Sequence, residues 1–76
     1  MTKTFEQKEI QYGSELFYIY IEQEKFSACY NVGICYKPIS SDSNTYRRLD
    51  ERYYETMTKA KRRFRDLCKQ VEEGKW

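Results

Sequence analysis

A helical repeat in the second half of the chain constrains the fold more than any other feature. Between residues 44 and 74, apolar side chains recur at steps of three and four, which places them on one side of an α-helix. We expect one helix over about residues 45–73, with Asn44 or Thr45 as its N-cap and Gly74 as its stop. The members of this apolar stripe are Tyr46, Leu49, Tyr53, Met57, Ala60, Phe64, Leu67, Cys68 and Val71.

A second interpretation of the same residues starts the helix later. Thr56 is also a suitable N-cap, and residues 46–54 would then form a fourth strand or a shorter helix. The unbroken repeat favours the single helix, which at ~1.5 Å per residue would be about 42 Å long. Because a three-stranded sheet cannot cover that length, we expect the end carrying Tyr46, Leu49 and Tyr53 to project and to be available for self-association.

Three runs in the first half of the chain have the composition of β-strands. Residues 4–12 are polar with a few apolar side chains, which suits an edge strand. Residues 15–23 and 26–36 are rich in β-branched and aromatic side chains. Gly13-Ser14 is a turn dipeptide between the first two runs, and Pro38 ends the third because it cannot donate a ladder hydrogen bond.

Short connections between successive strands predict an antiparallel meander. The expected fold is therefore α+β. A three-stranded antiparallel meander over about residues 4–37 is followed by a loop at residues 38–44 and one long C-terminal helix that packs on one sheet face (βββα). At 76 residues the chain forms a single small domain, residues 1–76, with a modest core.

Alternation along the strands assigns side chains to the two faces of the sheet. The face toward the helix should hold Phe17, Ile19, Ile21, Phe26, Ala28, Tyr30, Val32, Ile34 and Tyr36. Tyr18 and Tyr20 then point away from the helix, where they are candidates for stacking on bases or for contacting a protein. Gly33 marks a bulge or a place where another group approaches the backbone closely.

Positive charge is concentrated in the expected helix. Residues 1–43 hold four Lys and no Arg against six acidic residues, whereas residues 44–76 hold ten Lys and Arg against six. This helix face is a candidate for phosphate contacts, and the alternative is a solvated face with intrahelical ion pairs. We expect Arg62 and Arg63 to face solvent, opposite the apolar stripe. The candidate cations are Arg52, Lys59, Lys61, Arg62, Arg63, Arg65 and Lys69.

Several functional classes lack support in the sequence. The chain has no histidine, its three cysteines have no metal-ligand spacing, and its three glycines form no phosphate-binding loop. We therefore expect no enzymatic activity, no catalytic residue, no cofactor and no metal. An odd number of cysteines without a disulfide framework indicates free thiols and a cytoplasmic location, and no apolar run approaches the ~18 residues of a membrane span.

These patterns predict a small regulatory protein that binds through its basic helix and its tyrosine-bearing sheet face to a nucleic acid or a nucleoprotein complex. The alternative is a protein-binding inhibitor encoded by a phage or mobile element (anti-CRISPR-like), which acts by occluding a larger complex. A homodimer, formed through the far sheet face or the projecting helix end, is a third possibility.

Overall fold

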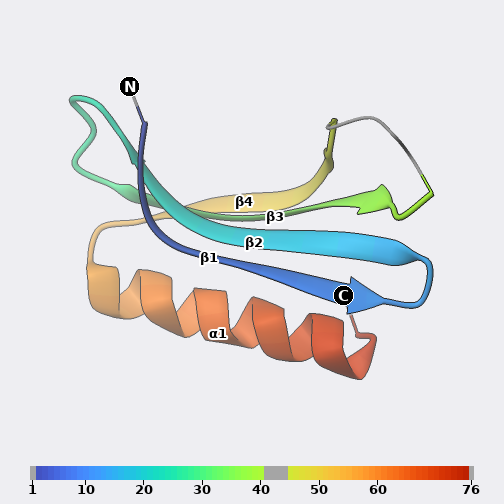
Figure 1. The fold of residues 1–76 in the computed structure, drawn as a ribbon. Coiled ribbons are helices and arrows are strands. Elements are labelled where there is room, and N and C mark those ends of the chain that lie inside the picture. Colours follow the sequence, from blue (N-terminus) through green and yellow to red (C-terminus); the bar gives the residue numbers. More distant parts are fainter. Residues whose placement is uncertain (1, 41–44, 76) are drawn as a thin grey trace.

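The computed structural model describes residues 2–40 and 45–75 and has an α+β architecture (Figure 1). Its antiparallel sheet has the order β1-β2-β3-β4, and a C-terminal helix packs on one face. The elements are β1 (Thr2–Tyr12), β2 (Glu15–Glu24), β3 (Tyr30–Pro38), β4 (Arg47–Tyr54) and α1 (Met57–Glu73). The meander and the C-terminal helix are confirmed, but the sheet has four strands rather than three.

The fourth strand is the main correction. Residues 47–54 pair antiparallel with β3, so the expectation that the helix begins near residue 45 is wrong and the later start is right. Pairing with β4 supplies hydrogen-bond partners to an edge of β3 that would otherwise remain open. Leu49 and Tyr53 are 44% and 62% exposed and do not continue the helix stripe, although their spacing matches it.

The helix has well-defined ends. The Thr56 hydroxyl accepts a hydrogen bond from the Lys59 backbone N–H at 3.3 Å, which makes Thr56 the N-cap in place of Thr45. Asn44, the other predicted cap, lies outside the described residues. Gly74 ends the helix in a left-handed conformation (φ 71°), as predicted, and its N–H donates to the Val71 carbonyl at 3.0 Å. At 17 residues α1 is about 26 Å long, so the predicted projecting end does not exist.

The first two connections show one confirmed prediction and one error. Gly13 adopts a positive φ of 63° in the β1–β2 turn, as its turn dipeptide predicts. The third strand, however, begins at Tyr30 and not at residue 26. Residues 25–29 form a turn in which the Ser27 N–H donates to the Glu24 carbonyl at 3.1 Å. Phe26 is consequently 95% exposed rather than part of the core face.

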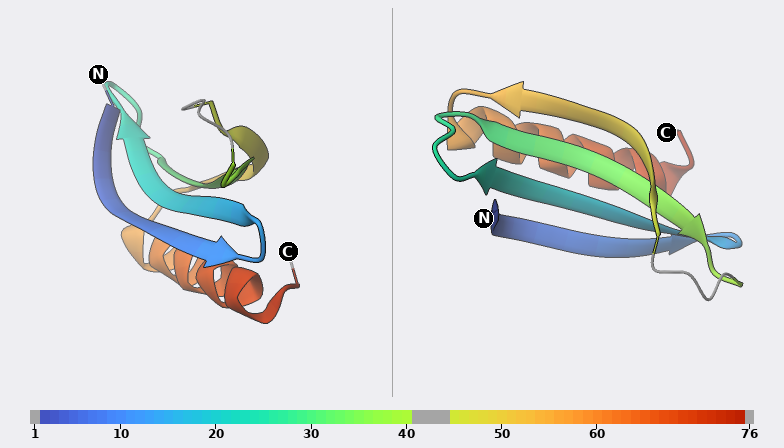
Figure 2. Two further views of the ribbon diagram at one scale, coloured as in Figure 1. Left: turned by 45° about the vertical axis from the view of Figure 1, so that its right-hand side comes forward. Right: turned by 90° about the horizontal axis from the view of Figure 1, so that it is seen from above.

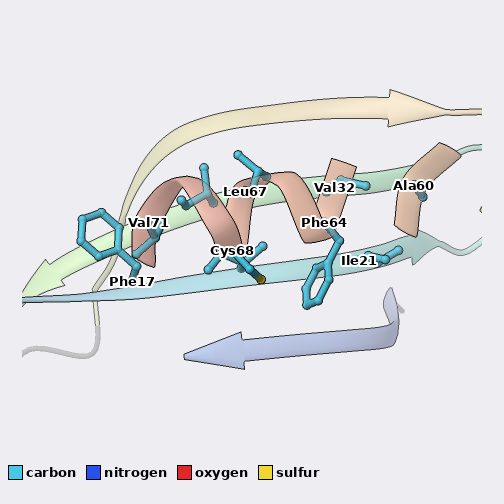
Figure 3. Close-up of a cluster of buried hydrophobic side chains, with 10 residues drawn as sticks. Phe17, Ile21, Val32, Ala60, Phe64, Leu67, Cys68 and Val71 are labelled. Carbon is cyan, nitrogen blue, oxygen red and sulfur yellow. The ribbon is translucent and has the colours of Figure 1, made fainter. Parts of the chain in front are cut away.

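The core lies in the single interface between the sheet and the helix. Its helix side is the part of the predicted stripe that begins after Met57, and its sheet side comes from β2 and β3 (Figure 3). Burying each large side chain here stabilises the fold by roughly 1.5–3 kcal/mol. The core residues are Phe17, Ile19, Ile21, Val32, Ile34, Ala60, Phe64, Leu67, Cys68 and Val71.

The sheet curls away from the helix. Figure 2 shows α1 running along the convex side, while the outer parts of β1 and β4 bend toward the opposite side. The sheet face away from the helix, here called the far face, is therefore the hollow one. Tyr18 and Tyr20 lie on this far face because they alternate along β2 with the core residues Phe17, Ile19 and Ile21.

Replacement of the N-cap tests the position of the helix start. We expect Thr56→Ala to lower the free energy of unfolding by about 1 kcal/mol, because the Lys59 N–H loses its acceptor. Thr58→Ala is the matched control, since Thr58 is exposed inside the helix and alanine is the better helix former there. Urea unfolding measures both. Equal stability of Thr56→Ala and the unsubstituted protein would contradict a helix that begins at Met57.

Candidate functional site

Five cations lie exposed on α1. Lys61, Arg65 and Lys69 follow one another at intervals of four residues and so share one side of the helix. Arg62 lies next to this row, and Lys59 lies one turn toward the N-terminus. Like charges at this spacing repel one another by a few tenths of a kcal/mol per pair, so the arrangement does not favour the isolated helix. The basic face is defined here as Lys59, Lys61, Arg62, Arg65 and Lys69.

None of these five cations forms an ion pair with any described residue. The ion pairs of residues 2–40 and 45–75 instead use Lys8 with Glu72, Lys75 with Glu73, Arg48 with Glu51, and both Arg52 and Arg63 with Asp50. The first two pairs compensate the carboxylates near the C-terminal end of α1. Asp66 is the acidic residue that remains among the five cations, so the basic face keeps a large excess of positive charge.

Arg63 and Arg52, two of the predicted binding residues, both form ion pairs with Asp50. A terminal nitrogen of Arg63 donates to Asp50 at 2.9 Å, and only 20% of the Arg63 side chain is exposed. The Arg63 Nε is buried without a hydrogen-bond partner. Arg52 lies on β4, not on the helix, and its Nε is 3.2 Å from the same carboxylate. The expectation that Arg63 faces solvent opposite the stripe is therefore wrong.

The position of Arg63 has a simple geometric reason. Residue 63 follows Ala60 by three positions and precedes Phe64, so it lies at the edge of the stripe and turns toward β4. Asp50, which the sequence analysis did not single out, organises this contact. Asp50, Arg52 and Tyr54 are spaced two residues apart, so in a strand they share one face, and in β4 that face is turned toward the helix. This spacing is the sequence feature that could have predicted the contact.

Tyr18 and Tyr20 are engaged within the far face. The Tyr20 hydroxyl donates to Glu51 at 2.9 Å, and the residue is 6% exposed. Its ring lies across Gly33, where a Cβ atom would collide with the Tyr20 hydroxyl, so the predicted close approach at Gly33 is confirmed. The Tyr18 ring stacks on that of Tyr20 at 5.6 Å, and the Tyr18 hydroxyl donates to Gln7 at 2.6 Å.

These tyrosines line a hollow of about 430 Å³ on the far face. Glu9, Glu22 and Arg48 also line it. Burial, followed by the nearby Glu51 carboxylate, raises the pKa of Glu22. Burial likewise raises the pKa of the Cys35 thiol, so at neutral pH that thiol is protonated and a poor nucleophile. Two carboxylates therefore border this hollow against one guanidinium, and that guanidinium is paired with Glu51, so the border is unfavourable for a phosphate.

The two predicted binding surfaces lie on opposite sides of the sheet. The basic face belongs to α1, which covers the convex side, whereas Tyr18 and Tyr20 lie on the hollow far face (Figures 1 and 2). A single rigid ligand cannot contact both at once. Arg62, Arg65 and Lys69 therefore form a candidate interface without the two tyrosines.

Comparison with known proteins provides no assignment. No protein-family model matches the chain, and comparison with curated proteins and with solved structures finds no significant match. Within residues 2–40 and 45–75, no helix is long and apolar enough to cross a membrane. The same residues contain no group of three or more His, Cys, Asp or Glu side chains that could hold a metal ion.

A pair of charge reversals at adjacent positions separates the structural arginine from the exposed one. We expect Arg63→Glu to lower the free energy of unfolding by about 2 kcal/mol, because it removes a charged hydrogen bond and places a second carboxylate beside Asp50. Arg62→Glu should change it by less than about 0.5 kcal/mol, as is usual for an exposed side chain. Thermal or urea unfolding measures both, and equal effects of the two would contradict the assigned helix faces.

Proposed function

We propose that this protein is a small non-enzymatic binding protein that docks the basic face of α1 on a nucleic acid or a nucleoprotein complex. The observation that carries the proposal is that the cations fall into two groups, those paired with a carboxylate and those that are not. The basic face keeps five exposed cations without carboxylate partners among the described residues, while the half-buried Arg63 and its neighbour Arg52 are paired with Asp50.

Phosphate binding would relieve the repulsion between the like charges on this helix. Repulsion along Lys61, Arg65 and Lys69 is relieved when phosphates approach, and release of condensed counterions adds to the binding free energy. Arg62 and Arg65 can each pair with two phosphate oxygens in a bidentate geometry. Because Ala60 and Phe64 are held in the core, the helix presents these groups without rearranging.

The proposal leaves Tyr18 and Tyr20 out of the phosphate-binding surface. Their hydroxyls are bonded to Gln7 and Glu51, and the carboxylates beside them disfavour a polyanion. The rings serve to cover Gly33 and to fill the concave side of a strongly curved sheet.

The hollow far face favours a second candidate function, a regulator that binds a protein and occludes it. Glu9 and Glu22 border an aromatic surface there, and aromatic groups with a polar rim are typical of protein interfaces. In that case the partner would carry basic side chains opposite the two carboxylates.

A fluorescence-anisotropy titration of labelled oligonucleotides with nuclease-treated protein tests the nucleic-acid proposal. For ~4 phosphate contacts on duplex DNA, we expect the logarithm of the association constant to fall with the logarithm of salt concentration with a slope of about −3.6. Arg62→Glu/Arg65→Glu should abolish binding near physiological salt, because each contact contributes to the affinity and each new carboxylate repels a phosphate.

The matched control is Lys37→Glu/Arg47→Glu, which makes the same change in net charge on β3 and β4. This control variant should bind nearly as tightly as the unsubstituted protein. Equal weakening of both double variants would mean that only net charge matters, and the basic face would not be the site. Absence of binding even at low salt would contradict the nucleic-acid proposal and favour the protein-binding candidate.

A further inference from the structure

Phe26 combines two unusual properties in the β2–β3 turn. Its side chain is 95% exposed, and its backbone has a positive φ of 71°, the only such value at a non-glycine residue among those described. The left-handed region is unfavourable for a bulky side chain, and asparagine or glycine adopts it more readily. Phe26 therefore gains little from folding, either from burial or from its backbone conformation.

The turn holds this exposed ring in a fixed position. The Ser27 N–H donates to the Glu24 carbonyl at 3.1 Å, and the Gln23 side-chain amide donates to the Ser27 carbonyl at 3.0 Å. The Ser27 hydroxyl accepts from the Cys29 N–H at 3.2 Å. Hydrogen bonds on both sides of Phe26 thus present the ring to solvent at little entropic cost on binding.

An open hollow with charged and polar side chains lies beside the ring. Phe26 borders this hollow of about 530 Å³, which Lys3, Gln23, Glu24 and Ser27 also line. The Lys25 ammonium lies 5.1 Å from the ring centroid of Phe26 and leaves the rest of the exposed ring accessible. Neither Lys3 nor Lys25 has an ion-pair partner in the described part of the chain.

We propose that this turn binds one unpaired nucleotide, with its base stacked on Phe26 and its phosphate held by Lys3 and Lys25. An aromatic face with neighbouring cations is the arrangement that single-stranded nucleic acids favour. Gln23 and Ser27 supply donors and acceptors for the edge of the base, and Lys3 and Lys25 outnumber the one carboxylate of the hollow, Glu24. The inference rests on the proposed function and narrows it, because it makes a strand with exposed bases the preferred ligand.

The position of the turn allows one strand to contact both sites. Tyr30, the first residue of β3, pairs with Tyr54, the last residue of β4, and α1 begins three residues after Tyr54. The β2–β3 turn and the N-terminal end of α1 therefore lie at the same end of the sheet, as Figure 1 shows. A flexible single strand can bend around this end of the sheet from Lys59 and Lys61 toward Phe26, whereas a duplex resists such sharp bending.

Substitution of Phe26 by asparagine tests the site without lowering the stability of the fold. Asn tolerates the left-handed backbone, so Phe26→Asn should be at least as stable as the unsubstituted protein in urea unfolding. In anisotropy titrations with oligonucleotides of about 12 nucleotides, the loss of one stacked base should raise Kd for the single strand by a factor of roughly 5 to 150. Kd for the duplex of the same sequence should not change.

Phe26→Trp in a Trp76→Phe background is the matched variant that keeps an aromatic ring. It should retain the preference for single strands, and its fluorescence should be quenched when the oligonucleotide binds, because the indole stacks on a base. Replacement of Lys3 and Lys25 by glutamine should weaken single-strand binding and make it less dependent on salt.

The outcomes separate this inference from the proposed function. Phe26→Asn with unchanged single-strand affinity would overturn the nucleotide site, and loss of binding in Arg62→Glu/Arg65→Glu would then still support the basic face. If the unsubstituted protein binds neither single strand nor duplex, both proposals are overturned. Destabilisation of Phe26→Asn would show that Phe26 has a packing role and would also overturn the site.

Discussion

The packing of one narrow helix stripe against β2 and β3 determines the rest of this structure. Ala60 and Val71 are fully buried, and Phe64 and Leu67 lie between them on the helix, in the same buried cluster as Ile21 and Val32 (Figure 3). Because a helix rotates by a fixed angle per residue, burial of this stripe fixes the direction of every other side chain on α1. The stripe thus places Arg62, Arg65 and Lys69 in solvent, although these residues contribute nothing to the core.

The same constraint divides the arginines into two groups. Arg63, at the edge of the stripe, lies within reach of Asp50 on β4 and ties the helix to the outer strand at 2.9 Å. Arg62, the preceding residue, turns away from the sheet and remains exposed. Adjacent basic residues in the sequence therefore have different roles. The rotation of the helix from one residue to the next decides which of them pairs with the sheet and which is available for binding. The nucleic-acid proposal follows from the second group alone.

The sequence predicts much of the fold but misplaces two segments, residues 47–54 and residues 26–29. The turn at Gly13, the inward face of β2 and the helix end at Gly74 follow from local chemistry and are confirmed. The error at β4 arises because Tyr46, Leu49 and Tyr53 continue the helical spacing by coincidence, while the open edge of β3 recruits the segment as a strand. Such pairing is a long-range effect that a local repeat does not report.

The candidate site was predictable only in part. The exposed cations of α1 are visible in the sequence, but the Arg63–Asp50 pair depends on β4, which the sequence offers only as the less favoured interpretation of residues 46–54. Phe26 was assigned to the core because it alternates with Tyr30 and Val32, and the turn at residues 25–29 breaks that alternation. The left-handed backbone of Phe26 was not predictable, because phenylalanine rarely adopts that conformation.

Mapping the bound nucleic acid by NMR tests the central claim most directly. In a titration of ¹⁵N-labelled protein with a single-stranded oligonucleotide, the account predicts amide shift changes along the outer side of α1 and in residues 25–27. The amides around Tyr20 and Glu51, on the far face, should not change. Shift changes concentrated on the far face, with α1 unaffected, would contradict the account.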